Sequence, residues 1–145
     1  MATFVKLNGF VEHLAEKVHN LGSDQLAVAL SNTAPGSEGT PPTGSTAACV
    51  LANVTQVSYT NCSSRNITTS TSAQTSGTYK LVLTDLVLTA SGGTVGPFRY
   101  IYIYNDTAAS DNLICYFDYG SSITLANGET LTIDFDATNG LLQVA

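Results

Sequence analysis

The first segment of the chain carries apolar residues at helical spacing. They fall at i, i+4, i+8 and i+11, on one face of a 3.6-residue period: Phe10, Leu14, Val18 and Leu21. Asn8 is a candidate N-cap, and Gly22 fits a C-terminal stop. The pattern predicts a short amphipathic helix, which must dock on its own domain or on a neighbour.

Beyond residue 22 the apolar period changes to two, which is typical of strands. In "DQLAVALSN" both phases are apolar, so we expect a strand that is covered on both faces. Residues 48–59 predict one strand or a short helix, and 67–72 give a weak strand signal. "TYKLVLTDLVLTAS" predicts one long strand, "NLICYFDYG" another, and residues 121–145 three more.

Turn signals separate these segments. Residues 33–47 are rich in proline and glycine and predict a long loop, which is typical of functional or partner-ordered segments. Asn127-Gly128 and Asn139-Gly140 lie between alternating runs and predict two hairpins. In the run between them, Leu131, Ile133 and Phe135 share one face, and Thr and Asp residues share the other. This alternation predicts a half-buried antiparallel strand.

The order of elements contains no βαβ spacing. We therefore expect a mainly β fold, an antiparallel β-sandwich that is jelly-roll-like or Ig-like, with a short N-terminal helix. A length of 145 residues favours one domain, with a helical segment at 1–22 and the sandwich at 23–145, including the 33–47 loop.

The stretch "PFRYIYIYND" places aromatic residues two apart: Tyr100, Tyr102 and Tyr104, with Phe98 in the same phase. A strand here would have one aromatic and one aliphatic face. The aromatic face could bind sugar, stack on single-stranded nucleic acid, or pack inside the protein or against another copy. The chain has no Trp, and Arg99 is phased to the opposite face, so we favour packing.

Charge is scarce and unevenly placed. Charged residues make up 11% of the chain and the net charge is −6. Residues 105–145 contain no Lys or Arg but hold six acids: Asp106, Asp111, Asp118, Glu129, Asp134 and Asp136. Because phosphate binding needs clustered bases, this excludes a nucleic-acid partner.

Asp134 and Asp136 share a strand face, where they could hold Ca²⁺ or act as an acid–base pair. We favour a third interpretation, in which they form a solvated acidic edge of the sheet.

Candidate catalytic groups are few. His13 and His19 stand at i and i+6, so they do not share a helix face, and we interpret both as surface residues. The chain lacks the common nucleophile, phosphate-loop and zinc motifs, so we expect no enzyme and no cofactor.

Its three cysteines, Cys49, Cys62 and Cys115, form no CxxC pair and predict free, mostly buried thiols. No apolar run is long enough for a membrane span or a signal peptide, so we expect folding in a cytoplasm.

Three segments resemble a family of small structural proteins of tailed bacteriophages: "FVEHLAEKVHNLGSDQLAVALSNTAP", "SAQTSGTYKLVLTDLVLTASGGTVGPFRYIYIYND" and "DYGSSITLANGETLTIDFDATNGLLQVA". The resemblance implies a virion component, most plausibly a capsid decoration (cement) protein on the capsid surface that is assembled in the host cytoplasm. Its partners would be the major capsid protein and other copies of itself. A tail or fibre component is the alternative, possibly a carbohydrate-binding module that uses the tyrosines and the acidic rim.

The contact surface for such partners is expected on two elements. The apolar face of the helix supplies three candidate interface residues and the aromatic strand supplies three more: Phe10, Leu14, Val18, Tyr100, Tyr102 and Tyr104. The order of the oligomer and the role of the 33–47 loop stay open at this point.

Overall fold

The computed structural model describes residues 2–36 and 48–145 of the chain. These residues form a mainly β fold with antiparallel sheets and one short α-helix, so the predicted fold class is confirmed. Most of the predicted 33–47 loop lies outside the described residues. In the described part of the chain, no helix has the length and hydrophobicity that a membrane crossing requires.

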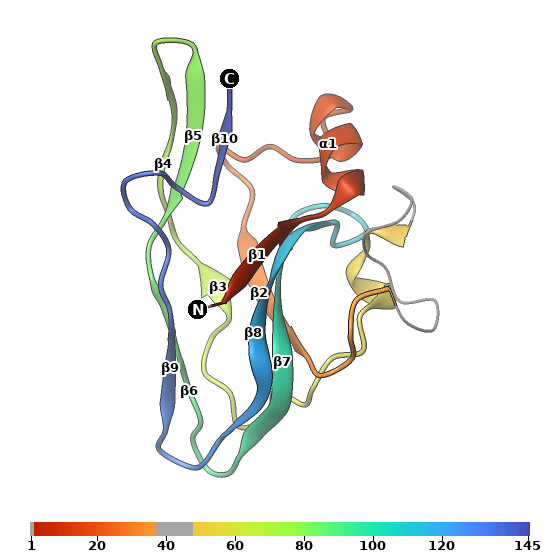
Figure 1. The fold of residues 1–145 in the computed structure, drawn as a ribbon, viewed down its shortest axis with the longest axis vertical. Helices are drawn as coiled ribbons and strands as arrows, with labels where there is room; N and C mark the ends of the chain where they lie inside the picture. The colour runs from red at the N-terminus through yellow and green to blue at the C-terminus, as the bar shows by residue number, and fades with distance from the viewer. Residues whose placement is uncertain (1, 37–47) are drawn as a thin grey trace.

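The elements follow one another along the chain in this order: β1 (Thr3–Lys6), α1 (Asn8–Ala15), β2 (Leu26–Ser31), a 3₁₀ helix (Leu51–Asn53), β3 (Asn66–Ile67), β4 (Thr69–Thr75), β5 (Thr78–Leu83), β6 (Leu86–Thr89), β7 (Val95–Asn105), β8 (Leu113–Leu125), β9 (Thr130–Ile133) and β10 (Leu142–Val144). Among the described residues they build three sheets, in the strand orders β1-β8-β7-β2-β3, β10-β5-β4 and β6-β9. The two smaller sheets lie on the same side of the five-stranded sheet (Figure 1). This arrangement is consistent with a β-sandwich.

The main core lies between the five-stranded sheet and the two smaller ones. Val28 and Ile103 from the large sheet share a buried cluster with Leu83, Leu88 and Ile133 from the smaller sheets. β2 is buried along its whole length, as its doubly apolar sequence predicted. Burial of this apolar surface is the main force that holds the layers together.

The opposite face of the large sheet carries the tyrosines of β7. Tyr100, Tyr102 and Tyr104 are buried against Leu7 and the segment that contains Cys49 and Val54. Packing within the protein, the favoured interpretation of the aromatic face, is therefore confirmed. A sugar-binding platform on these rings is wrong, because Tyr102 is only 2% exposed.

Phe98 departs from the predicted phase. It packs in the main core beside Ile101, not with the tyrosines. The cause is a shift in the pairing of β7 with β8 between Phe98 and Tyr100, where the partner residue jumps from Ile123 to Asp118. Such an irregularity turns the strand and moves one side chain to the other face.

Helix α1 is shorter than its apolar period predicted. It ends at Ala15, and Lys17 follows with a φ of 65°. The N–H of Val18 then donates to the carbonyl of His13 at 2.8 Å, and the helix ends seven residues before the expected stop, Gly22. The predicted N-cap is also wrong: Leu7 occupies that position, and its side chain makes no capping hydrogen bond.

Two strand boundaries differ from the prediction. The expected single strand at 78–91 is split into β5 and β6 at Thr84 and Asp85. There the Thr84 N–H donates to Thr68, and the Asp85 carboxylate accepts the N–H of Phe135 at 2.9 Å. β8, in contrast, continues through Gly120, whose φ of 92° lets the strand bend rather than stop.

Both Asn-Gly pairs form turns, as Gly128 and Gly140 have positive φ, but neither turn is a hairpin. β9 pairs with β6 and β10 pairs with β5, so the strands that flank each turn are not partners. The first turn is attached to the end of β6, where the Gly128 N–H donates to Ala90. The alternation of buried and exposed side chains through Leu131, Ile133 and Phe135 is confirmed.

Candidate functional site

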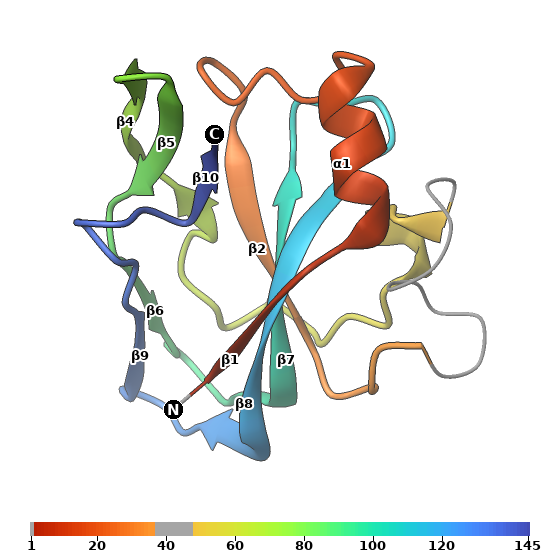
Figure 2. The ribbon, with the colours of Figure 1, turned by 45° about the horizontal axis from the view of Figure 1, so that its top comes forward.

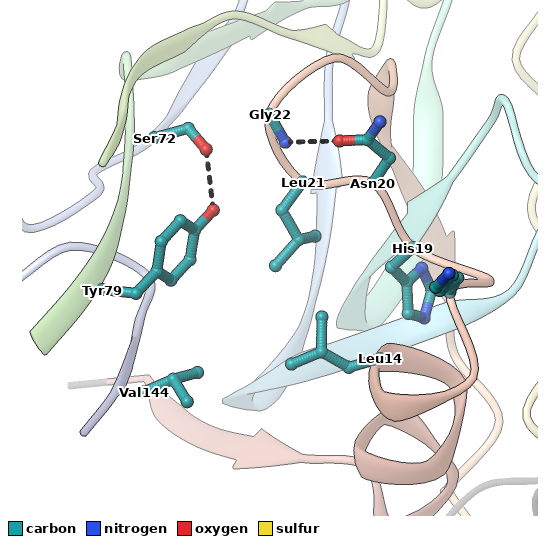
Figure 3. Close-up of a pocket in the computed structure, with 9 residues that line it drawn as sticks. Leu14, His19, Asn20, Leu21, Gly22, Ser72, Tyr79 and Val144 are labelled. Atoms are coloured by element: carbon teal, nitrogen blue, oxygen red, sulfur yellow. Dashed lines mark hydrogen bonds between the residues drawn. The ribbon is translucent and has the colours of Figure 1, made fainter. Parts of the chain in front are cut away.

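A pocket of about 620 Å³ opens between the chain that follows α1 and the sheet of β4, β5 and β10 (Figure 3). The segment after the helix supplies one wall, and the smaller sheet supplies the other. The lining residues are Leu14, Lys17, His19, Asn20, Leu21, Gly22, Ser72, Tyr79 and Val144.

The walls of this pocket are apolar and its polar groups are mostly satisfied. Leu14 and Leu21 face Val144 and the Tyr79 ring across the opening. The Tyr79 hydroxyl lies 2.8 Å from the Ser72 hydroxyl, within hydrogen-bond distance. Such a surface can bind an apolar or amphipathic group with few directional contacts.

The pocket depends on the early end of α1. The left-handed Lys17 reverses the chain, so that the segment after it passes back beside the helix. This reversal buries His19, which stacks on Phe10 with ring centroids 5.3 Å apart. A helix continued to Gly22 would have pointed His13 and His19 in different directions.

The two histidines are therefore core residues, and their interpretation as surface residues is wrong. His13 and His19 are 6% and 5% exposed, and their rings meet edge to face. His13 Nε2 lies 3.3 Å from the side-chain amide nitrogen of Asn112, and His19 Nδ1 lies 3.2 Å from that of Asn105. The other ring nitrogen of each histidine is buried with no hydrogen-bond partner.

This environment favours the neutral form of His19. Burial, together with the nearby His13, lowers the pKa of His19 to about 4, while Asp24 acts in the opposite direction. Asp24 also accepts the Asn105 side-chain amide at 2.6 Å. The cluster thus attaches α1 to the residue before β8, through His13 and Asn112, and the segment after α1 to the end of β7, through His19, Asp24 and Asn105.

Two polar side chains that line the pocket already have hydrogen-bond partners. Ser72 is bonded to Tyr79, and His19 to Asn105. The described residues also contain no group of three His, Cys, Asp or Glu side chains that could hold a metal ion.

Two of the acidic residues of 105–145, Asp118 and Asp136, have local partners. Asp118 forms a two-pronged ion pair with Arg99 at 2.7 and 2.8 Å. This contact lowers the pKa of Asp118. Asp136 accepts backbone N–H groups from Thr138 and Asn139, which lowers its pKa also. Asp136 therefore stabilises a local backbone turn, whereas Asp118 links β8 to β7.

The six expected interface residues are not brought together on one surface. Phe10 is in the main core and the three tyrosines are in the second cluster, whereas Leu14 lines the pocket and Val18 is half-buried. A partner could therefore reach Leu14 and Val18 directly, but it would meet the tyrosines only through the chain segment that covers them. The interface itself stays a prediction.

The sequence pattern missed a second hollow, at the edge of the large sheet. It lies between the start of β1 and β9 and contains Phe4, Phe117 and Asp134. The alternating "TFVK" before the helix was the available signal, but it is only four residues long.

The three cysteines are free, as predicted: Cys49 and Cys115 are buried and Cys62 is half-buried. Comparisons of the chain with protein-family models, with curated proteins and with solved structures find no match.

Proposed function

We propose that this chain is a non-enzymatic virion protein of a tailed bacteriophage, a capsid decoration protein that binds the assembled major capsid protein shell and stabilises it. The observation that carries the proposal is a weakly charged β scaffold on which several large apolar side chains are exposed. Among the described residues, five large apolar side chains are at least 43% exposed: Phe4, Val11, Val87, Tyr119 and Val144. Three of these, Phe4, Tyr119 and Val144, line hollows, and apolar groups exposed in this way are suited to contact with other proteins.

The major capsid protein is proposed as the partner because the sequence resembles those of small phage structural proteins. The scarcity of charge agrees with it, since a decoration protein works by covering surface rather than by attracting nucleic acid. Its position would be the capsid surface, where several copies contact one another as well as the shell. The carbohydrate-binding alternative loses its proposed platform, because the tyrosines of β7 are buried.

The test is co-sedimentation of the purified chain with expanded shells of the phage that encodes it. We expect saturable binding and a higher melting temperature of the shell, since a ligand that binds only the assembled form stabilises that form. A strict monomer that neither sediments with the shells nor raises their melting temperature would overturn the proposal.

A further inference from the structure

The hollow at the edge of the large sheet is a groove between two sheets. Two adjoining pockets of about 290 and 310 Å³ share Phe117 and Asp134 as lining residues. The first pocket joins Ala2, just before β1, to Thr132 in β9, and Figure 2 shows the start of the chain beside that strand. β1 ends the five-stranded sheet and β9 belongs to the two-stranded one, and they do not pair.

The backbone of β1 has unused hydrogen-bonding groups on the groove side. The N–H of Leu7 donates to the carbonyl of Ile114 at 3.1 Å, which makes these two residues a hydrogen-bonded pair. Bonded pairs alternate along an antiparallel ladder, so Phe4, opposite Phe117, is in a non-bonded pair. The N–H and C=O of Phe4 therefore point away from β8, off the edge of the sheet.

The same reasoning applies to β9. The Ala90 N–H donates to Glu129 at 3.0 Å, so the next bonded pair is Leu88 with Leu131. Thr132, opposite Val87, is then in a non-bonded pair, and its N–H and C=O point away from β6. The groove thus lies between two strand edges whose backbone groups have no partner strand.

The floor of the groove is aromatic. Phe4 lies 5.5 Å from Phe117, and Phe117 lies 6.5 Å from Phe135, measured between ring centroids. Phe4 and Tyr119 are each 43% exposed, which is high for such large apolar side chains. These rings are placed to receive the alternate apolar side chains of an extended segment.

The charge of the groove has one sign. Asp134 lines both pockets, and in the described part of the chain its carboxylate makes no ion pair or hydrogen bond. Asp136 lines the second pocket, and no Lys or Arg is among the lining residues of either. A segment that carries Lys or Arg would complement this surface.

We propose that this groove binds an extended, basic segment of another polypeptide by strand addition. Backbone hydrogen bonds to Phe4 and Thr132 would align the segment, its apolar side chains would cover the aromatic floor, and a cation would pair with Asp134. A second copy of this chain is a poor occupant, since its net charge is −6 and its Arg65 and Arg99 already contact Tyr59 and Asp118. That the segment belongs to the shell protein rests on the proposed function.

The experiment uses the full chain and a short synthetic peptide in which Val alternates with Lys and Thr. Titration followed by amide NMR should show saturable binding, with shifts confined to β1, β9, the 134–141 segment and the part of β8 around Phe117 and Tyr119 that lines the groove. A second peptide is N-methylated on every other residue, on the side whose N–H groups would bond to one of the two strand edges. It should bind about tenfold more weakly, since methylation removes those backbone donors. A peptide with Gln in place of Lys should also bind more weakly, because it has no cation to pair with Asp134.

Two variants locate the contact. Phe4→Ser should weaken binding about tenfold, whereas Val11→Ser, which removes a comparably exposed side chain from α1, should leave it unchanged. Asp134→Asn should weaken binding of the Lys peptide but not of the Gln peptide. Because these side chains are exposed, the variants are expected to fold, and their amide spectra check this.

Several results would overturn the inference: no binding of the Lys peptide at millimolar concentration, equal affinity after N-methylation, or shifts elsewhere on the chain. Self-association that Phe4→Ser abolishes would assign the groove to a second copy instead. Shell binding without peptide binding would reject this groove and leave the proposed function intact. Peptide binding without shell binding would reject the proposed function and leave the groove.

Discussion

The imidazole rings of His13 and His19 meet edge to face with their centroids 5.7 Å apart, although the residues lie on different segments of the folded chain. An amide nitrogen can only donate, so Asn112 donates to His13 Nε2 and Asn105 donates to His19 Nδ1. The neutral His19 ring then carries its proton on Nε2, the nitrogen that has no partner. Protonation of His19 would place a second donor against the Asn105 amide and a positive charge in the core.

Stability should therefore fall in mildly acidic solution. The pKa of His19 is about 4 in the folded chain and 6.5 in the unfolded chain, so the unfolded chain binds more protons between these values. The stabilisation is complete above pH 6.5 and is lost as the pH falls towards 4. We expect the free energy of unfolding, measured with urea at a series of pH values, to drop by about 2 kcal/mol over this window.

The control for this prediction is His19→Gln, which keeps an acceptor for Asn105 but does not titrate. Its free energy of unfolding should vary much less between pH 6.5 and 4. Asp118 and Asp136 have lowered pKa values, so their contributions are lost only below their ordinary pKa of 3.8, in a separate window. A wild-type stability that stays flat from pH 6.5 to 4 would contradict the burial of a neutral His19.

Removal of a buried tyrosine should destabilise the whole fold. Tyr102→Ala deletes a ring that is 2% exposed and packs 5.4 Å from the Tyr116 ring, so we expect a loss of about 3–5 kcal/mol in urea unfolding. Tyr119→Ala is the matched control, because this side chain is 43% exposed and should contribute less than about 1 kcal/mol. An unchanged midpoint for Tyr102→Ala would mean that the ring is not part of the core.

The sequence predicted the fold class and the buried strand faces because those features depend on the spacing of apolar residues over short stretches of the chain. It failed where the outcome depended on distant partners. Asn127-Gly128 has the chemistry of a hairpin turn, yet β9 leaves β8 and pairs with β6, since sheet pairing is decided by the whole core. The helix ends early, at Ala15, because Lys17 is left-handed although its residue type gives no helix-stop signal, and the chain reversal there brings the two histidines together.

The reactivity of the thiols should follow their burial. Burial raises the pKa of all three cysteines, and Cys115 is completely enclosed, whereas Cys62 is half-buried. With Ellman's reagent at pH 7.5 we expect slow labelling of Cys62 alone in the native protein and of all three thiols in urea. Cys62→Ser should abolish the native reaction; rapid native labelling of Cys115 would contradict the described core.

The turn at Gly140 should tolerate no side chain. Gly140 has a φ of 77°, and a Cβ atom there would lie 2.4 Å from the carbonyl oxygen of Leu81. That carbonyl accepts the N–H of Leu141 at 2.8 Å, so it cannot move without breaking the attachment of β10 to β5. We expect Gly140→Ala to lower the free energy of unfolding by about 2–4 kcal/mol, measured by urea titration.

The matched control is Gly128→Ala, in the other Asn-Gly turn. Gly128 has a similar φ of 90°, but no atom lies within 4 Å of the position of its Cβ. Its substitution meets only the backbone strain of the left-handed region, about 1 kcal/mol. The difference between the two variants therefore measures the contact with Leu81, and equal losses would show that β10 does not hold the turn at Gly140 against β5.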